Sequence, residues 1–447
     1  MSRSSKKKAG HPGKTPVWTM AIALVLCGFC LAFVPCGFGK EALISGAEWD
    51  GHLKLYTRAL FPGSDSPYQA VGLSSNFDGY AELRLNNKTF FGDALFLEVN
   101  YEALAGGGDT RRDGERLKEM YPGLFPHGLS NPVRDDRRFF DLTAILHDSR
   151  DTFSYHRLDR AFFSFSPSWG EIRLGRQAVT WGHGFTFNPM DLFNPFSPTD
   201  LEREYKTGDD LILVQFPVNG VDVELIYVVR RNPDTGDTGT DENSLGAKLH
   251  FRLGDMGTDL MAARHYRDFI TGIGCVGDLG NAAWRLDLTG TFLDKESHGR
   301  SFYLSALANI DYSWIWLGKN WYGYVELYYN GLSRNNYTDQ FDDPAVSERL
   351  DRGELFVLGR WYASASLNLE IHPLVNAYIT PVVNLNDGSG MLLPRIVYEV
   401  SDNIRATLTA TLNWGDANTE YGGYAIPGTG FYATPANTIS AWITWYF

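Results

Sequence analysis

The sequence predicts an all-β protein: a transmembrane antiparallel up-and-down β-barrel of about 16–18 strands, preceded by a cleaved signal peptide. Three observations lead to this prediction. An apolar run lies near the N-terminus, apolar and polar residues alternate in short segments after it, and the connectors between these segments alternate between short and long. The 46 Gly and the 14% aromatic residues also suit strands and tight turns better than long helices.

The first 39 residues have the order of a secretory signal peptide. Basic residues come first, an apolar run follows from Val17 to Val34, and Gly37 and Gly39 are small residues suited to cleavage after Gly39. The alternative is an uncleaved membrane anchor. We therefore expect residues 1–39 to be the signal peptide and residues 40–447 to be the exported barrel, in which Cys275 is the one remaining cysteine. A single cysteine excludes an internal disulfide.

Charge and hydropathy exclude two other classes of protein. The chain has 40 Lys and Arg against 53 Asp and Glu, and a net charge of −13 argues against a nucleic-acid partner. A mean hydropathy of −0.23 argues against a membrane protein built from many helices.

Period-two alternation dominates the chain from about residue 50 onward, most clearly in Ser244–Leu253 and Ile404–Trp414. Each such strand has one apolar face and one polar face. A soluble sandwich would bury the apolar face in a core, whereas a barrel turns it toward lipid. The predicted strands cover residues 51–60, 79–86, 94–102, 157–165, 170–179, 210–217, 220–229, 244–253, 259–267, 270–277, 282–293, 301–314, 321–330, 354–371, 375–386, 390–400, 404–414 and 438–447.

Two further patterns favour the barrel over the sandwich. Aromatic residues gather at strand ends, as in Tyr312, Trp314 and Trp316, where a barrel has its interfacial girdles. Short connectors such as 401–403 alternate with long polar ones such as 331–352. Membrane barrels have short turns on the periplasmic side and long loops outside, so an even number of strands leaves both termini in the periplasm.

The C-terminal segment Ile439–Phe447 is an alternating strand that ends on an aromatic residue. It resembles the terminal strand of bacterial outer-membrane proteins. This resemblance implies that Phe447 is part of the signal read by the barrel assembly machinery. It also implies that the chain lies in the bacterial outer membrane, in contact with lipid.

Residues 182–209 form the least generic connector, because repeated Asn-Pro pairs and several aromatic residues make it too apolar for a solvated tether. We predict that this candidate constriction loop folds into the pore; the alternative is an extracellular cap packed on itself. The spacing of Thr199 and Glu202 matches a capping box and predicts a short helix through Tyr205. The residues singled out in this loop are His183, Phe185, Phe187, Asp191, Phe193 and Tyr205.

In the segment Gly175–Gly182, Gly-Arg-Gln is followed by three other residues and then by Trp-Gly. This segment joins a predicted strand to the candidate constriction loop. This arrangement is similar to porin and alginate-export-type barrels, in which an arginine-bearing strand enters a constricting loop. The resemblance covers this stretch and the general barrel pattern, and it identifies neither a subfamily nor a substrate.

The alternation of side chains along each predicted strand places charged residues at positions that face the lumen. Charges are tolerated better there than at the lipid midplane. Arg160, Arg173 and Arg176, with Arg84 near them, predict a basic rung suited to sugar hydroxyls or carboxylates. The alternative is that these arginines pair with acids such as Asp159 and stiffen the wall. The predicted pore-lining and selectivity residues are Arg84, Glu98, Arg160, Glu171, Arg173, Arg176, Lys248, Arg252 and Arg285.

Motifs of catalysis and metal binding are absent from the sequence, including His-Glu-x-x-His, the Gly-x-Ser-x-Gly elbow and the P-loop. One loose catalytic candidate remains, His183 with Asp191 and Asp200 nearby in the chain. We expect no enzyme activity, no metal site and no cofactor.

The predicted function is an outer-membrane channel for passive diffusion of small hydrophilic solutes, since barrels of this size leave an aqueous lumen. One alternative is a conduit that houses a partner, such as an electron carrier or an exported polymer. Another is a surface enzyme or adhesin that uses the long loops. A homotrimer is common among barrels of this size. The sign of ion selectivity stays open, because the acidic loop Asp234–Glu242 favours cations and the arginine rung favours anions.

Overall fold

The computed structural model describes residues 44–63, 65–70, 72, 75–121, 135–195, 197, 200–334, 337–340, 343–426 and 429–447. The predicted signal peptide, residues 1–39, lies outside the described residues. Among the described residues, no helix is long and apolar enough to cross a membrane.

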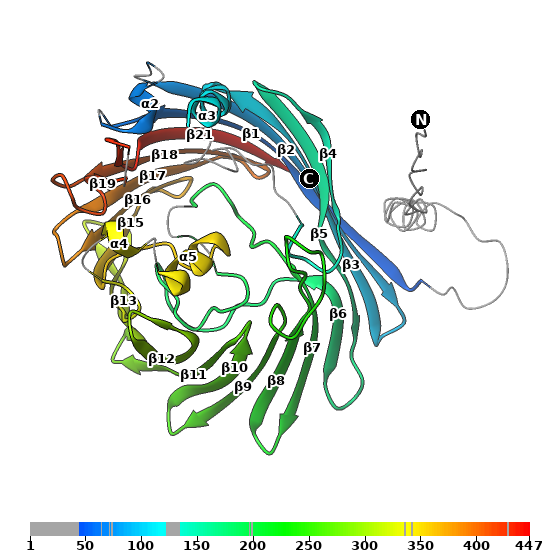
Figure 1. Ribbon diagram of the computed structural model, residues 1–447. Helices are drawn as coiled ribbons and strands as arrows, with labels where there is room; N and C mark the ends of the chain where they lie inside the picture. Colours follow the sequence, from blue (N-terminus) through cyan, green and yellow to red (C-terminus); the bar gives the residue numbers. More distant parts are fainter. Residues whose placement is uncertain are drawn as a thin grey trace, which may run out of the picture.

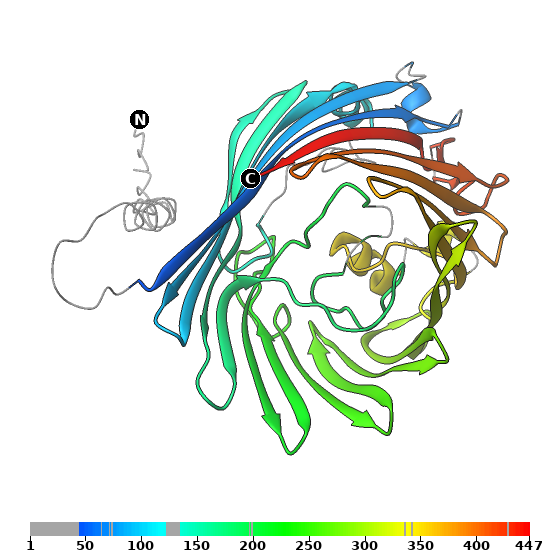
Figure 2. The same ribbon diagram turned by 180° about the vertical axis from the view of Figure 1, so that it is seen from behind.

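In the described part of the chain, 18 antiparallel strands form one closed barrel (Figures 1 and 2). A further short strand, β4 (Thr143–Asp148), pairs only with β5, and β19 (Tyr424–Ala425) pairs with β20 (Tyr432–Ala433) in a separate two-stranded sheet. The wall strands are β1 (Gly46–Phe61), β2 (Asn76–Phe91), β3 (Leu95–Gly108), β5 (Thr152–Phe165), β6 (Glu171–Gln177), β7 (Asp209–Val218), β8 (Val221–Val228), β9 (Ser244–Leu253), β10 (Met256–His265), β11 (Asp268–Leu279), β12 (Ala282–Ser297), β13 (Arg300–Trp316), β14 (Lys319–Asn330), β15 (Trp361–His372), β16 (Val375–Asn384), β17 (Gly390–Ser401), β18 (Ile404–Trp414) and β21 (Asn437–Tyr446).

The prediction of an antiparallel barrel of about 16–18 strands is confirmed. Each predicted strand overlaps one wall strand, and 244–253 and 404–414 match β9 and β18 at both ends. The predicted strand 354–371 is wrong at its start, because β15 begins at Trp361. Residues before it pack inside instead: Val357 is buried mainly among residues of the wall strands, and Leu358 is buried among residues of the connector between β14 and β15.

The ring closes between the first and last wall strands. β1 pairs with β2 on one side and with β21 on the other, where Leu53 lies opposite Trp445. The Gly51 N–H donates to the Phe447 carbonyl at 2.9 Å, and the Phe447 N–H donates to the Gly51 carbonyl at 3.0 Å. The ladder therefore continues through the last residue of the chain, and the beginning of β1 and the end of β21 lie at the same end of the barrel.

The connectors differ between the two ends of the barrel. At the end that holds Phe447, two-residue turns such as Asn219-Gly220 and Leu317-Gly318 have positive φ at both positions (52° and 82°; 52° and 69°), as type I′ hairpins require. The other end carries the longer connectors and the helices α2 (Pro67–Ala70), α3 (Asp109–Met120), α4 (Tyr337–Gln340) and α5 (Pro344–Asp351). This is the arrangement that the sequence predicts.

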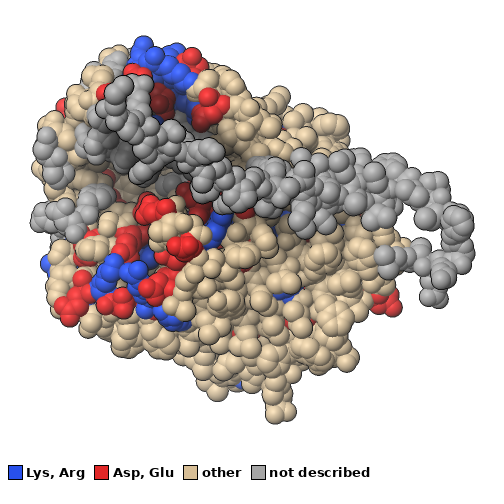
Figure 3. Space-filling view, turned by 45° about the vertical axis from the view of Figure 1, so that its right-hand side comes forward, with Lys and Arg blue, Asp and Glu red and all other residues tan. Residues whose placement is uncertain are grey.

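Alternate residues of the wall strands face opposite environments. On β1, Leu53 and Leu55 point outward and are 37% and 56% exposed, whereas His52 and Lys54 point inward and are 1% and 5% exposed. Near the short-turn end, Trp314 stacks on Trp321 with ring centroids 6.2 Å apart on the outer face. Figure 3 shows a largely uncharged outer wall, with charged side chains gathered at one end. An outward apolar band with an aromatic rim is the surface of a barrel that sits in a membrane.

Barrel closure gives a first prediction, because a Cβ atom on Gly51 would lie 2.3 Å from the Arg84 carbonyl oxygen and 2.9 Å from the Phe447 ring. We expect Gly51→Val to lower the free energy of unfolding in detergent by about 1–3 kcal/mol, the usual cost of overpacking. A urea titration measures this loss, with the folded fraction taken from the heat-modifiable band of the folded barrel on an electrophoresis gel. Gly79→Val is the control, since a Cβ at Gly79 meets nothing within 4 Å. Equal stability of the two variants would contradict the prediction.

Candidate functional site

The connector between β6 and β7, residues 178–208, runs inside the barrel (Figures 1 and 2). Its contacts reach wall strands on several sides of the ring. The Trp181 indole N–H donates to Glu224 on β8, His183 contacts Asp287 on β12, and Glu202 accepts a hydrogen bond from Tyr56 on β1. Since these partners lie on inward faces, the described part of this segment, which we call the lumen loop, lies within the lumen.

One buried carboxylate binds three successive residues of the first arm of the lumen loop. Glu326 on β14 is 1% exposed and accepts the backbone N–H groups of three successive residues, Phe185 at 2.7 Å, Thr186 at 3.0 Å and Phe187 at 2.9 Å. The Asn309 amide donates to the same carboxylate at 3.2 Å. Charge-assisted hydrogen bonds of this kind are stronger than neutral ones, and they fix the height of the loop in the barrel.

Aromatic stacking continues this attachment. Phe185 stacks on Tyr324 with centroids 4.5 Å apart, and Phe187 stacks on Tyr328 at 4.7 Å. Phe193 packs edge-on against Trp181 at 5.0 Å in an apolar cluster with β7, β8, β10 and β11. Phe187 and Phe193 are therefore buried against the wall, whereas Phe185 is 42% exposed.

The two arms of the loop are also joined to each other. The Lys206 ammonium contacts the Asp191 carboxylate and donates to the Thr180 hydroxyl at 2.8 Å. Asn194 accepts the Val179 N–H at 3.0 Å and donates to the Thr207 carbonyl at 3.0 Å. Burial raises the pKa of Asp191 to about 7, although Lys206 acts in the opposite direction.

The acids that the sequence suggested as partners of His183 are not its partners in the fold. His183 Nδ1 lies 2.7 Å from Asp287, and its Nε2 lies 3.4 Å from Asp259. Asp191 and Asp200 pair instead with Lys206 and Arg203. Among the described residues, no group of His, Cys, Asp or Glu side chains is arranged to hold a metal ion.

The short helix predicted through Tyr205 is wrong over residues 200–205, which are not helical. Wall groups bind this segment in place of local backbone bonds. Lys54 donates to the Glu202 carbonyl at 2.7 Å, and Ser440 donates to the Glu202 carboxylate at 3.2 Å. Tyr205 stacks on His52 with centroids 5.9 Å apart, and the Arg84 guanidinium lies 4.1 Å from the Tyr205 ring centroid. These tertiary contacts outweigh the local capping signal.

The four arginines of the predicted basic rung all carry carboxylate partners. Arg84 lies 2.7 Å from Asp159 and 3.7 Å from Glu102, and Arg160 lies 3.2 Å from Asp159. The remaining two form the pairs Arg173 with Glu171 at 2.8 Å, and Arg176 with Asp135 at 2.7 Å and Asp210 at 3.0 Å. The alternation along the predicted strands indicated the inward direction of Arg84, Arg160 and Arg173, but the pairing neutralises all four arginines.

The other predicted pore-lining residues are spread around the wall. Arg285 pairs with Asp311 at 2.5 Å and lies 4.6 Å from the Phe185 ring centroid, and the Lys248 ammonium lies 5.6 Å from the Trp181 ring centroid. Glu98 accepts a hydrogen bond from Asn100 at 3.4 Å, and Arg252 is exposed on β9. These residues do not form one cluster.

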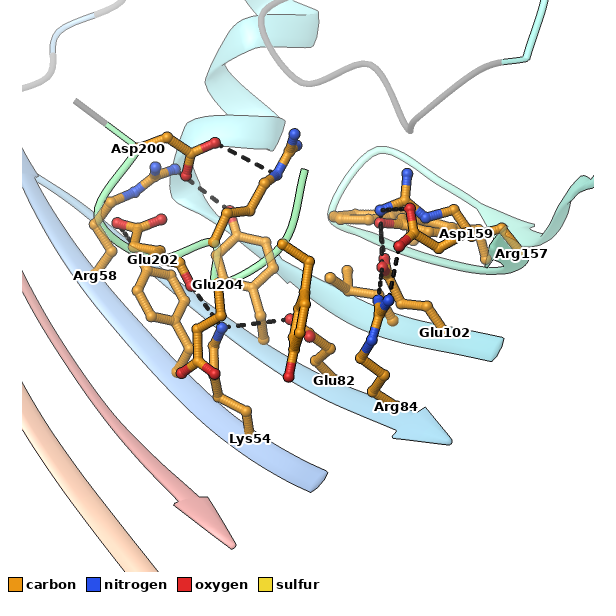
Figure 4. A pocket seen from close by; sticks show the side chains of 17 residues that line it. Lys54, Arg58, Glu82, Arg84, Glu102, Arg157, Asp159, Asp200, Glu202 and Glu204 are labelled. Carbon is orange, nitrogen blue, oxygen red and sulfur yellow. Dashed lines mark hydrogen bonds and ion pairs between the residues drawn. The ribbon is translucent and has the colours of Figure 1, made fainter. Parts of the chain in front are cut away.

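Two cavities of 260 Å³ lie beside the lumen loop. The first separates the loop residues from Asp200 to Tyr205 from the wall of β1, β2, β3 and β5 (Figure 4). The second lies against β14 to β17, and it is lined by Phe185, Tyr322, Tyr324, Tyr378 and Arg395, among others.

Sequence reasoning missed most of the side chains around the first cavity. The charged residues that it did not place at the lumen are Lys54, Arg58, Glu102, Arg157, Glu202, Arg203 and Glu204. The alternation of β1 with His52, Lys54, Tyr56 and Arg58 on one face was the available signal for the two basic residues of that strand.

Comparison with known proteins places this geometry in a structural class. No protein-family model matches the sequence, and no curated protein matches it. Solved structures do match: Pseudomonas aeruginosa OccK9 (OpdG) has 12% identity and a TM-score of 0.51 over 91% of this chain and 100% of that one. OccK2 (OpdF) of the same organism, in complex with glucuronate, has 8% identity and a TM-score of 0.51 over 91% and 99%. Acinetobacter baumannii OccAB3 has 9% identity and a TM-score of 0.50 over 90% and 100%.

The fold is that of bacterial outer-membrane porins. The prediction of a porin-like barrel is therefore confirmed, and its subfamily stays unidentified. At these identities the likeness concerns the arrangement of strands, so the solutes of the matched proteins say nothing of this chain.

The Glu326 clamp gives a second prediction. We expect Glu326→Ala to reduce the hydrogen-exchange protection of the Phe185, Thr186 and Phe187 amides by about tenfold or more, because a lost buried acceptor costs about 1–3 kcal/mol. Amide exchange followed by mass spectrometry measures this change. Glu370→Ala is the control, since Glu370 accepts an exposed hydrogen bond from Asn320 at 2.9 Å and lies outside the lumen-loop contacts. Unchanged protection in Glu326→Ala would contradict the prediction and show that the other contacts of this arm hold the loop.

The raised pKa of Asp191 gives a third prediction. An unfolded aspartate titrates near 3.9, so the folded loop binds a proton more tightly than the unfolded chain between about pH 4 and pH 7. The stability contributed by this group is complete below about pH 4 and is lost as the pH rises toward 7. We expect protection of the loop amides, corrected for intrinsic exchange, to fall over this range. Asp191→Asn should flatten this dependence, and an unchanged slope in the variant would refute the assignment.

Proposed function

We propose that the chain is an outer-membrane porin through which small hydrophilic solutes diffuse passively, and that it is not an enzyme. The observation that supports this proposal most is the lumen itself. A closed barrel of 18 strands holds an inserted loop with a cavity on each side, and the first cavity is lined by eleven charged residues, ten of which are labelled in Figure 4. Polar and charged groups around a cavity let water and hydrated solutes enter.

The lumen loop would act as the constriction. Its first arm is tied to β14 by the Glu326 carboxylate, and its second arm is tied to β1 and β21 through Glu202. A loop held from both sides narrows the lumen without depending on its own secondary structure. Solutes would pass between the loop and the wall.

The packing of the lumen loop also argues against a conduit that houses a protein partner or a polymer. Phe187 packs in one buried cluster with Val357 and Tyr421, which come from two other connectors. The chain thus fills part of its own lumen with packed apolar side chains. A small solute fits the remaining cavities better than a macromolecule does.

Channel recordings test the proposed function. Refolded protein in planar bilayers is expected to show a steady open conductance without any partner. Replacing residues 185–204 with a short Gly-Ser linker should raise the conductance by about twofold or more, because the obstruction in the aqueous path is removed. Shortening residues 233–241, which are exposed or half-exposed in another connector, is the control and should leave conductance unchanged. A barrel that stays closed in all three forms would contradict the porin and favour the conduit.

A further inference from the structure

The wall of the first cavity includes Arg84 of the predicted basic rung, but it carries no unpaired cation in the described part of the chain. Lys54 lies 3.5 Å from Glu82, and Arg58 lies 3.1 Å from Asp78. Arg84 reaches Asp159 at 2.7 Å, and Arg157 reaches Glu102 at 2.7 Å, so that these two arginines and two acids form one network (Figure 4). The wall side of the cavity is therefore close to neutral.

The loop side of the cavity carries the uncompensated charge. Arg203 pairs with Asp200 at 3.4 Å. Within the described residues, no Lys or Arg nitrogen lies within 4.0 Å of the carboxylate oxygens of Glu202 or Glu204, although the Lys54 ammonium donates to the Glu202 carbonyl at 2.7 Å. Glu202 accepts hydrogen bonds from Tyr56 and from Ser440, and Glu204 accepts one from Tyr446 at 3.2 Å. Hydroxyl donors leave the charge of a carboxylate in place, so this face stays negative.

We propose that Glu202 and Glu204 make the passage through this cavity selective for cations, so that the organic solutes it admits best carry an ammonium group. This inference rests on the proposed porin function and specifies the sign of the charge that the channel prefers. A carboxylate pair at a narrow passage with low-dielectric walls concentrates cations and repels anions. An ammonium group also donates the N–H bonds that carboxylate oxygens accept most strongly.

The second cavity provides the competing route. Arg395 lies over the Tyr378 ring, 4.4 Å from its centroid, and has no Asp or Glu oxygen within 4.0 Å among the described residues. Solutes that pass along this side meet a positive charge. If the main route runs there, the channel prefers anions, and Arg395 rather than the two glutamates controls the preference.

The zero-current potential in a KCl gradient across a planar bilayer tests the proposal. We expect the wild-type channel to prefer K⁺ over Cl⁻, and the Glu202→Gln/Glu204→Gln double variant to lower the permeability ratio by about twofold or more. Glutamine keeps the size and the hydroxyl contacts of each side chain. Asp255→Asn, in the exposed turn between β9 and β10 and outside the cavity, is the control and should leave the ratio unchanged.

Organic ions extend the same measurement to the solute class. Two salts are compared, ethanolammonium chloride and sodium glucuronate. The ethanolammonium cation should carry more current through the channel than the glucuronate anion does, and the double variant should reduce this difference. An anion preference that Arg395→Gln abolishes would overturn the proposal while leaving the porin function intact. A wild-type preference for K⁺ that the double variant keeps would also overturn it. A channel that never conducts would instead refute the proposed function.

Discussion

Backbone hydrogen bonding in a membrane is the constraint on which this structure depends. In lipid, every N–H and C=O group must find a partner within the protein, and a sheet satisfies this demand only when its first and last strands pair. The pairing of β1 with β21, extended through the two bonds between Gly51 and Phe447, completes the ring. Because that pairing is antiparallel, the number of wall strands is even, and the beginning of β1 and the end of β21 lie at the same end of the barrel.

Closure also creates an interior that must accommodate polar side chains, because alternate residues of every strand point inward. Charges inside a protein are stable when they are paired and hydrogen-bonded. The network of Arg84, Glu102, Arg157 and Asp159 satisfies this requirement on the wall of the first cavity. An interior rich in arginine is therefore compatible with a wall of little net charge, and the charges left uncompensated determine the local field.

The lumen loop extends the same principle to a segment without regular secondary structure. The backbone N–H and C=O groups of a loop buried in a barrel need hydrogen-bond partners, and side chains of the wall provide them. Glu326 accepts three consecutive amides, and Lys54 donates to the Glu202 carbonyl. The wall thus takes over the role that a helix or a sheet ladder plays elsewhere, and the conformation of the loop depends on residues distant in the sequence.

The sequence by itself determined the strands, their faces and their order, because period-two alternation and turn chemistry are local signals. Ser244–Leu253 and Ile404–Trp414 have the predicted bounds for this reason. It also indicated the lumen loop and the inward direction of Arg84 and Arg173. Only the tertiary structure decided which groups meet across the lumen: His183 lies beside Asp287 and not beside Asp191, and residues 200–205 lack the helix that their capping signal favours. The physical reason is that ion pairs and wall contacts join residues from strands far apart in the chain, and local patterns carry no information on such distances.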